Sequence, residues 1–176
     1  MREPVDADRI RDFARALGSR ARDEVRVYLT GGATSVLRGW RPTTIDIDLK
    51  IVPDSDPLLF ALPELKKRYR VNVELASPDD FIPELSGWQD RSIFTAREGT
   101  VSFFHYDPYS QALAKLERGH DQDLRDVRRM LEEGLVEPKQ LLDFFEQIEP
   151  RLYRFPAIDP RAFRRAVEAA CRERLS

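Results

Sequence analysis

Residues 29–49 read LTGGATSVLRGWRPTTIDIDL, and two structural signals meet in this stretch. A predicted strand over residues 25–29 runs toward Gly31 and Gly32, which allow positive φ and a close approach of the backbone to another group. The next residues, 33–39, suit a short helix whose first N–H groups lack partners within the helix. A strand, a glycine turn and a helix start in this order are typical of a phosphate site.

Side chains near the turn add further donors for phosphate oxygens. Thr34 and Ser35 carry hydroxyls, and Arg38 and Arg41 carry guanidinium groups that can bond two phosphate oxygens at once. The glycines alone are a weak signal, because many strand-to-helix turns use glycine for backbone reasons only. We therefore expect phosphate binding from the glycines together with these four side chains.

Residues 43–52 predict a second strand with a strict alternation of side chains. Asp46 and Asp48 project to the same face, because side chains two positions apart in a strand point the same way. Two neighbouring carboxylates repel each other in the absence of a cation, and Mg²⁺ binds through one or two carboxylates plus substrate phosphates. Taken alone, the pair could instead be the solvated face of an edge strand.

A third acid, Glu74, lies in a short predicted strand over residues 71–75. If this strand neighbours the one that carries Asp46 and Asp48, the three carboxylates form one cluster. A paired site of this kind holds two ions about 3.5–4 Å apart. We therefore expect two Mg²⁺ ions, with Mn²⁺ as a substitute, on these three acids. Glu74 would also orient or deprotonate an incoming hydroxyl; the alternative is an ordinary surface glutamate.

This combination resembles the signature of the nucleotidyltransferase superfamily (polymerase-beta-like). That signature is a glycine pair opening a short helix, Asp-hydrophobic-Asp on the next strand, and a separate third acid. Residues 41–49, RPTTIDIDL, are most similar to the small prokaryotic branch that includes the DUF6036 proteins and the AbiEii-type toxins. The resemblance implies an α/β (α+β) core with a mixed sheet, followed by a C-terminal helical unit. It also implies an NTP substrate, such as ATP, with Thr44 in the nucleotide-binding set.

The same resemblance implies functional residues in the helical part of the chain. Lys115 would contact the nucleotide phosphates, and Asp123 or Asp126 would lie near the site. Read from the residues alone, Lys115 could be a surface side chain with its stem along apolar neighbours. Asp123 and Asp126, with arginines around them, could be an ordinary solvated charge ladder.

Helices and strands alternate up to residue 106, and only helices are predicted after it. We therefore expect a nucleotidyltransferase α/β core over residues 1–106 and a C-terminal helical unit over residues 107–176. The core includes a hairpin around Glu98 and Gly99. The predicted helices cover residues 6–21, 33–39, 58–69, 108–119, 121–133, 138–148 and 160–175.

The composition limits the partners. Among 176 residues, 29 Lys and Arg against 31 Asp and Glu leave a net charge of −2, so no global field attracts a polyanion and no extended nucleic-acid track is expected. No apolar run approaches the length of a membrane span, and the charged start is unlike a signal peptide. A single Cys excludes a disulfide framework. We expect a cytoplasmic protein with no membrane partner.

The sequence therefore predicts a metal-dependent nucleotidyltransferase that moves a nucleoside monophosphate from an NTP to a hydroxyl acceptor. The candidate acceptors are an RNA 3′ end such as that of tRNA, a protein, or a small molecule. The resemblance to toxins makes a toxin of a toxin–antitoxin system, with a cognate antitoxin as partner, one version of this hypothesis. The alternative is a non-catalytic nucleotide-binding or antitoxin-like protein that retains the fold.

Overall fold

The computed structural model describes residues 2–175, and the side chains of residues 2–173. The chain forms two compact units, the first from Met1–Ser77 and Ser92–Tyr106, the second from Pro78–Arg91 and Asp107–Ser176. The sequence predicts residues 78–91 as part of the α/β core, whereas the structure does not group them with its strands. They group with the second unit, where the Arg91 guanidinium lies 2.9 Å from the carboxylate of the fully buried Asp107.

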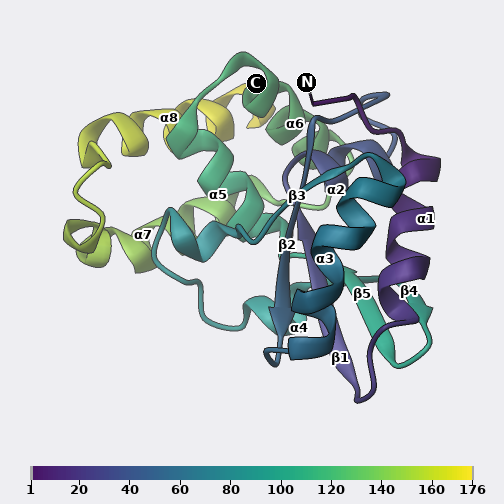
Figure 1. The fold of residues 1–176 in the computed structure, drawn as a ribbon. Helices are drawn as coiled ribbons and strands as arrows, with labels where there is room; N and C mark the ends of the chain where they lie inside the picture. The colour runs from purple at the N-terminus through teal and green to yellow at the C-terminus, as the bar shows by residue number, and fades with distance from the viewer. Residues whose placement is uncertain (1, 176) are drawn as a thin grey trace. The chain divides into compact units, whose positions relative to one another are not determined.

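A five-stranded mixed sheet organises the first unit (Figure 1). Its order is β3-β2-β1-β5-β4. β1 is antiparallel to β2 and parallel to β5, while β2 is parallel to β3 and β4 antiparallel to β5. The mixed sheet of the α/β core and the helices after it are therefore confirmed. The strands are β1 Val25–Thr30, β2 Asp46–Val52, β3 Asn72–Glu74, β4 Ile93–Glu98 and β5 Val101–His105.

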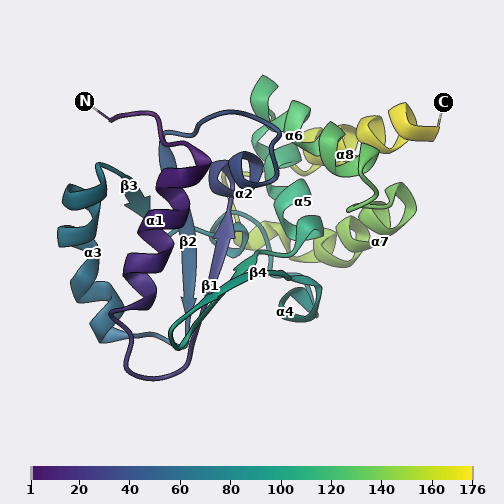
Figure 2. The ribbon, with the colours of Figure 1, turned by 90° about the vertical axis from the view of Figure 1, so that its right-hand side faces the viewer.

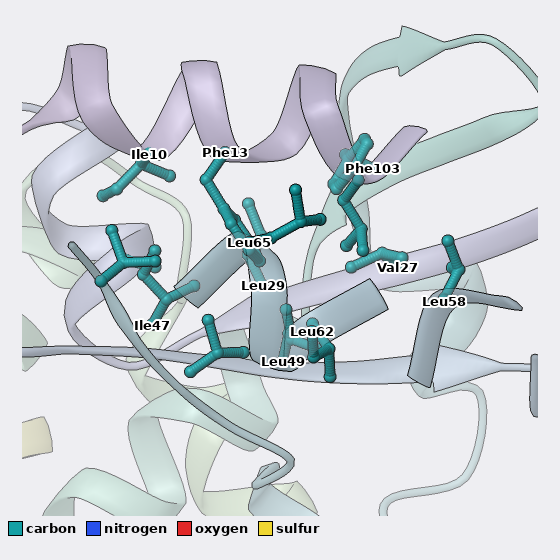
Figure 3. Close-up of a cluster of buried hydrophobic side chains, with 14 of the residues drawn as sticks. Ile10, Phe13, Val27, Leu29, Ile47, Leu49, Leu58, Leu62, Leu65 and Phe103 are labelled. Atoms are coloured by element: carbon teal, nitrogen blue, oxygen red, sulfur yellow. The ribbon is translucent and has the colours of Figure 1, made fainter. Parts of the chain in front are cut away.

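Two helices, α1 (Ala7–Gly18) and α3 (Asp56–Tyr69), pack together and cover one face of this sheet (Figure 2). A third, α2 (Gly32–Leu37), follows β1 directly. Figure 3 shows the apolar layer between the sheet and the two longer helices. Its labelled side chains are Ile10 and Phe13 from α1, Leu58, Leu62 and Leu65 from α3, and Val27, Leu29, Ile47, Leu49 and Phe103 from the strands.

The alternation in β2 decides which side chains reach this core. Ile47, Leu49 and Ile51 are buried, whereas Asp46 and Asp48 keep partial exposure on the opposite face. A slip of one residue would exchange the two sets and place carboxylates in the apolar layer. The hydrophobic pattern thus fixes the register that presents the acids.

Capping side chains mark the start of both longer helices of the first unit. Asp6 accepts a hydrogen bond from the Arg9 amide and caps α1. Ser55 caps α3, which therefore begins two residues earlier than predicted and contains Pro63 in its interior. The second strand begins only at Asp46, because Thr44 forms an isolated antiparallel bridge with Val5.

The second unit is helical. The buried carboxylate of Asp107 accepts hydrogen bonds from the Tyr109 and Ser110 amides and so caps the first long helix of the unit. A single-turn helix over residues 88–91 and a 3₁₀ segment over residues 149–154 were not anticipated from the sequence. The elements are η1 Pro78–Asp80, α4 Trp88–Arg91, α5 Pro108–Arg118, α6 Asp121–Glu132, α7 Pro138–Ile148, η2 Glu149–Arg154 and α8 Pro160–Leu175.

Candidate active site

The glycine turn between β1 and α2 approaches the acidic strand more closely than any side chain would allow. Gly31 has φ +61°, and a Cβ built there would lie 3.0 Å from Oδ2 of Asp48. A Cβ at Gly32 would overlap Thr44 and lie 3.2 Å from a guanidinium nitrogen of Arg41. The turn therefore brings backbone, one carboxylate and one guanidinium close to the start of β2.

Thr34, Ser35 and Thr44 are buried, and their hydroxyls bond within the fold. Ser35 donates to the Gly31 carbonyl at 3.2 Å, and Thr44 donates to the Asp46 carbonyl at 3.1 Å. Thr34 donates to the Leu29 carbonyl at 3.2 Å. In this structure the three hydroxyls hold the turn and the start of β2 in shape, and their contact with phosphate stays a prediction.

A buried histidine on β5 supports the same turn. Nδ1 of His105 lies 3.0 Å from the Thr34 hydroxyl, whose single proton goes to the Leu29 carbonyl, so the bond requires His105 to donate from Nδ1. Burial, and secondarily the positive charge of Arg38, lowers the pKa of His105 to about 4. The ring is therefore neutral at pH 7, and Arg38 carries its charge close to α2.

The three acids come from neighbouring strands. β3 runs parallel to β2, with Asn72 opposite Asp46 and Glu74 opposite Asp48. Asp46 and Asp48 share one face of β2, since the residue between them is buried on the other. The strand adjacency that a three-acid cluster requires is thus present.

Asp46 and Glu74 are connected through two residues that the sequence analysis did not select. Nδ2 of Asn72 donates to Asp46 at 2.7 Å and to Glu74 at 3.2 Å. Nη1 of Arg2 lies 3.2 Å from Asp46 Oδ1 and 3.6 Å from Glu74 Oε1. Within the described residues, no group of three or more His, Cys, Asp or Glu side chains is placed to hold a metal ion. Metal binding by all three acids stays a prediction.

Lys115 belongs to a buried charge cluster of the second unit. Its side chain is 4% exposed, and Nζ lies 2.8 Å from Asp126 and 3.8 Å from Asp123. Arg118 donates two hydrogen bonds to Asp123, and Gln122 donates one to Asp126. The alternatives of a surface lysine and a solvated charge ladder are therefore wrong. Contact of Lys115 with nucleotide phosphates stays a prediction.

The charge state of this cluster follows from its contacts. Burial by itself would raise the pKa of Asp123, but the hydrogen bonds and charge of Arg118, with the charge of Lys115, hold it below the usual value. Both aspartates face α5 because they lie three positions apart on α6. Lys115 thus forms a buried ion pair with Asp126.

Gly32→Ala is expected to destabilise the protein by about 1–3 kcal/mol, because the new methyl group would overlap Thr44. Urea unfolding measures the change. In Gly39→Ala a Cβ meets nothing within 4 Å, but φ of +78° strains any side chain there, so this variant gives the cost of backbone strain without steric overlap. A Gly32→Ala protein as stable as the wild type would contradict the close approach.

Lowering the pH from 6.5 to 4 is expected to remove stability through His105. The pKa of His105 is about 4 in the folded protein and 6.5 ordinarily, so as the pH falls the unfolded chain binds a proton before the folded protein does. The stability that the neutral ring contributes is therefore fully present above pH 6.5 and is lost as the pH falls toward 4. His105→Gln should flatten this part of the stability curve by up to about 3 kcal/mol. His120→Gln, at an exposed position, is the control. Equal slopes for His105→Gln and wild type would contradict the assignment.

Lys115→Met is expected to cost about 3–5 kcal/mol, because it leaves the Asp126 carboxylate buried without its ion-pair partner. The double variant Lys115→Met/Asp126→Asn, which removes both charges, should regain most of that loss. Thermal and urea unfolding without nucleotide measure the stability of the single and the double variant. An additive loss in the double variant would show that the two residues are not coupled.

Comparison with known proteins places these residues in a family. The family model described as "Nucleotidyltransferase of unknown function (DUF6036)" matches residues 8–148, which include every predicted site residue. Neither the curated proteins nor the solved structures gave a match. No helix among the described residues is long and apolar enough to cross a membrane. Because the match covers most of the chain, the protein belongs to the DUF6036 family of nucleotidyltransferases.

Proposed function

We propose that this protein is a divalent-metal-dependent enzyme that transfers a nucleoside monophosphate from an NTP, such as ATP, to a hydroxyl acceptor. The observation that carries the proposal is the contact between the glycine turn and Asp48. A turn suited to phosphate and a strand face suited to a cation meet there, in a chain that belongs to a nucleotidyltransferase family.

The donor set suits a hard divalent cation. Asp46 and Asp48 offer carboxylate oxygens from one strand face, and Mg²⁺ or Mn²⁺ is bound by one or two carboxylates together with substrate phosphates. A bound ion would neutralise the charge that develops on the phosphates. Glu74 contacts Asn72 and Arg2 through Oε1, so its Oε2 could join the set.

The remaining steps fall to groups of the chain itself. Backbone N–H groups at Gly31 and Gly32, with Arg41 and Arg38, would hold the phosphates by hydrogen bonds and charge. Glu74 would orient or deprotonate the acceptor hydroxyl. The acceptor oxygen then attacks the α-phosphorus, and pyrophosphate leaves. Catalysis would come mainly from positioning and charge stabilisation.

The acceptor is proposed to be an RNA 3′ end, a protein hydroxyl or a small molecule. The net charge of −2 argues for contact with the end of an acceptor rather than with a long nucleic-acid track. A toxin role with a cognate antitoxin, and a cytoplasmic location, stay predictions. Incubation with each α-labelled NTP, Mg²⁺ and total cellular RNA or protein would identify the labelled class.

One observation favours the second candidate function, a non-catalytic nucleotide-binding or antitoxin-like protein. Asn72 and Arg2 engage Asp46 and Glu74, so these carboxylates already have partners within the first unit. Calorimetry that detects NTP binding, without pyrophosphate release in the presence of acceptor, would favour this alternative over the enzyme.

Asp46→Asn/Asp48→Asn is expected to reduce nucleotide transfer by at least about 100-fold, because the variant loses the charges that would hold the cation near the phosphates. Transfer of α-labelled nucleotide to the acceptor is the measurement. Asp8→Asn/Asp12→Asn is the control, since it makes the same charge change on α1, where both acids pair with arginines of the same helix. Transfer that persists in the first variant would refute the proposed function.

A further inference from the structure

The N-terminal arm, residues 2–6, delivers a positive charge to the acidic face of the sheet. Nη1 of Arg2 lies 3.2 Å from Oδ1 and 3.5 Å from Oδ2 of Asp46, and 3.6 Å from Oε1 of Glu74. The sequence separation between Arg2 and Asp46 is 44 residues. A cationic nitrogen therefore already contacts carboxylates that are proposed to bind a metal ion.

The arm is held in place immediately after Arg2. Val5 is fully buried, and its backbone exchanges two hydrogen bonds with Thr44, at 2.7 and 2.9 Å, just before the start of β2. The Arg9 guanidinium bonds to the Pro4 carbonyl at 3.3 Å and to the Arg70 carbonyl, just before β3, at 3.4 Å. Few residues separate Arg2 from these anchors, so its local concentration at the acids is high.

The contact itself is easily broken. The Arg2 side chain is 59% exposed, and exposed ion pairs contribute little because water competes for both partners. Asn72, a neutral donor, makes a separate hydrogen bond to Asp46 at 2.7 Å that does not involve Arg2. Removal of Arg2 would thus take away a charge but leave Asp46 oriented.

We propose that Arg2 is an internal counter-ion of the acidic site, which a divalent cation must displace from Asp46 before it binds. The proposal rests on the proposed function, because it takes Asp46 to be a metal ligand. The N-terminal arm thereby sets the metal affinity of the enzyme. In the metal-free protein Arg2 relieves the repulsion between Asp46 and Glu74, and a bound cation takes over this role.

The test is calorimetric titration of the full chain with Mn²⁺ in the absence of nucleotide. Arg2→Gln should bind Mn²⁺ about two- to five-fold more tightly than the wild type, which is the range expected for loss of an exposed ion pair. Arg2→Lys keeps the charge and should stay near the wild type. Arg11→Gln is the matched control, because it removes one positive charge from α1, where Arg11 pairs with Asp8.

A second readout uses unfolding rather than heat of binding. At a fixed, sub-saturating Mn²⁺ concentration, the rise in melting temperature should be larger for Arg2→Gln than for the wild type, because tighter binding stabilises the folded state more. Arg11 pairs with Asp8 on its own helix and not with the acids of the sheet, so Arg11→Gln should match the wild type in both experiments.

The outcomes separate this inference from the proposed function. Wild-type and Arg2→Gln proteins that bind Mn²⁺ with equal affinity would overturn the role of Arg2 and leave metal binding intact. Equal tightening by Arg2→Gln and Arg11→Gln would reduce the effect to net charge and also overturn it. No Mn²⁺ binding by any variant would overturn both this inference and the metal dependence of the proposed function.

Discussion

The two-sided character of β2 is the constraint on which the rest of the first unit depends. Three apolar side chains of this strand are buried under α1 and α3, and the intervening carboxylates must then lie on the other face. The same register sets Thr30 of β1 opposite Asp48, and so brings the glycine turn against that carboxylate. Burial of the apolar face thus positions the acids beside the turn.

The two charge clusters, Lys115 with Asp126 and Asp46 with Glu74, differ in burial and in the strength of their contacts. In the second unit, Lys115 and Asp126 are almost fully buried and bonded to each other, so separating them is costly. In the first unit, Asp46 and Glu74 are partly exposed and contact an exposed arginine and a neutral amide. The first arrangement fixes its partners, whereas the second can exchange one partner for another. The proposed binding of a cation at Asp46 would require such an exchange.

The residues around the glycine turn are closely packed and leave little room for a larger side chain. Gly32 contacts Thr44, and Thr44 in turn pairs with the backbone of Val5 and donates to the Asp46 carbonyl. The N-terminal arm, the glycine turn and the start of β2 are therefore one packed assembly. His105 extends it to β5 through Thr34. Any substitution in this assembly is expected to affect stability and nucleotide binding together.

The sequence by itself determined the features that depend on short-range periodicity and backbone freedom. The alternation of β2 and the glycine turn could be read directly, because each involves residues within a few positions of one another. Only the tertiary structure decided the contacts of Arg2 with Asp46, the burial of Lys115 and the grouping of residues 78–91. These contacts depend on which segments, distant in the sequence, pack together. The packing is decided by the burial of the whole core, and no local sequence pattern encodes it.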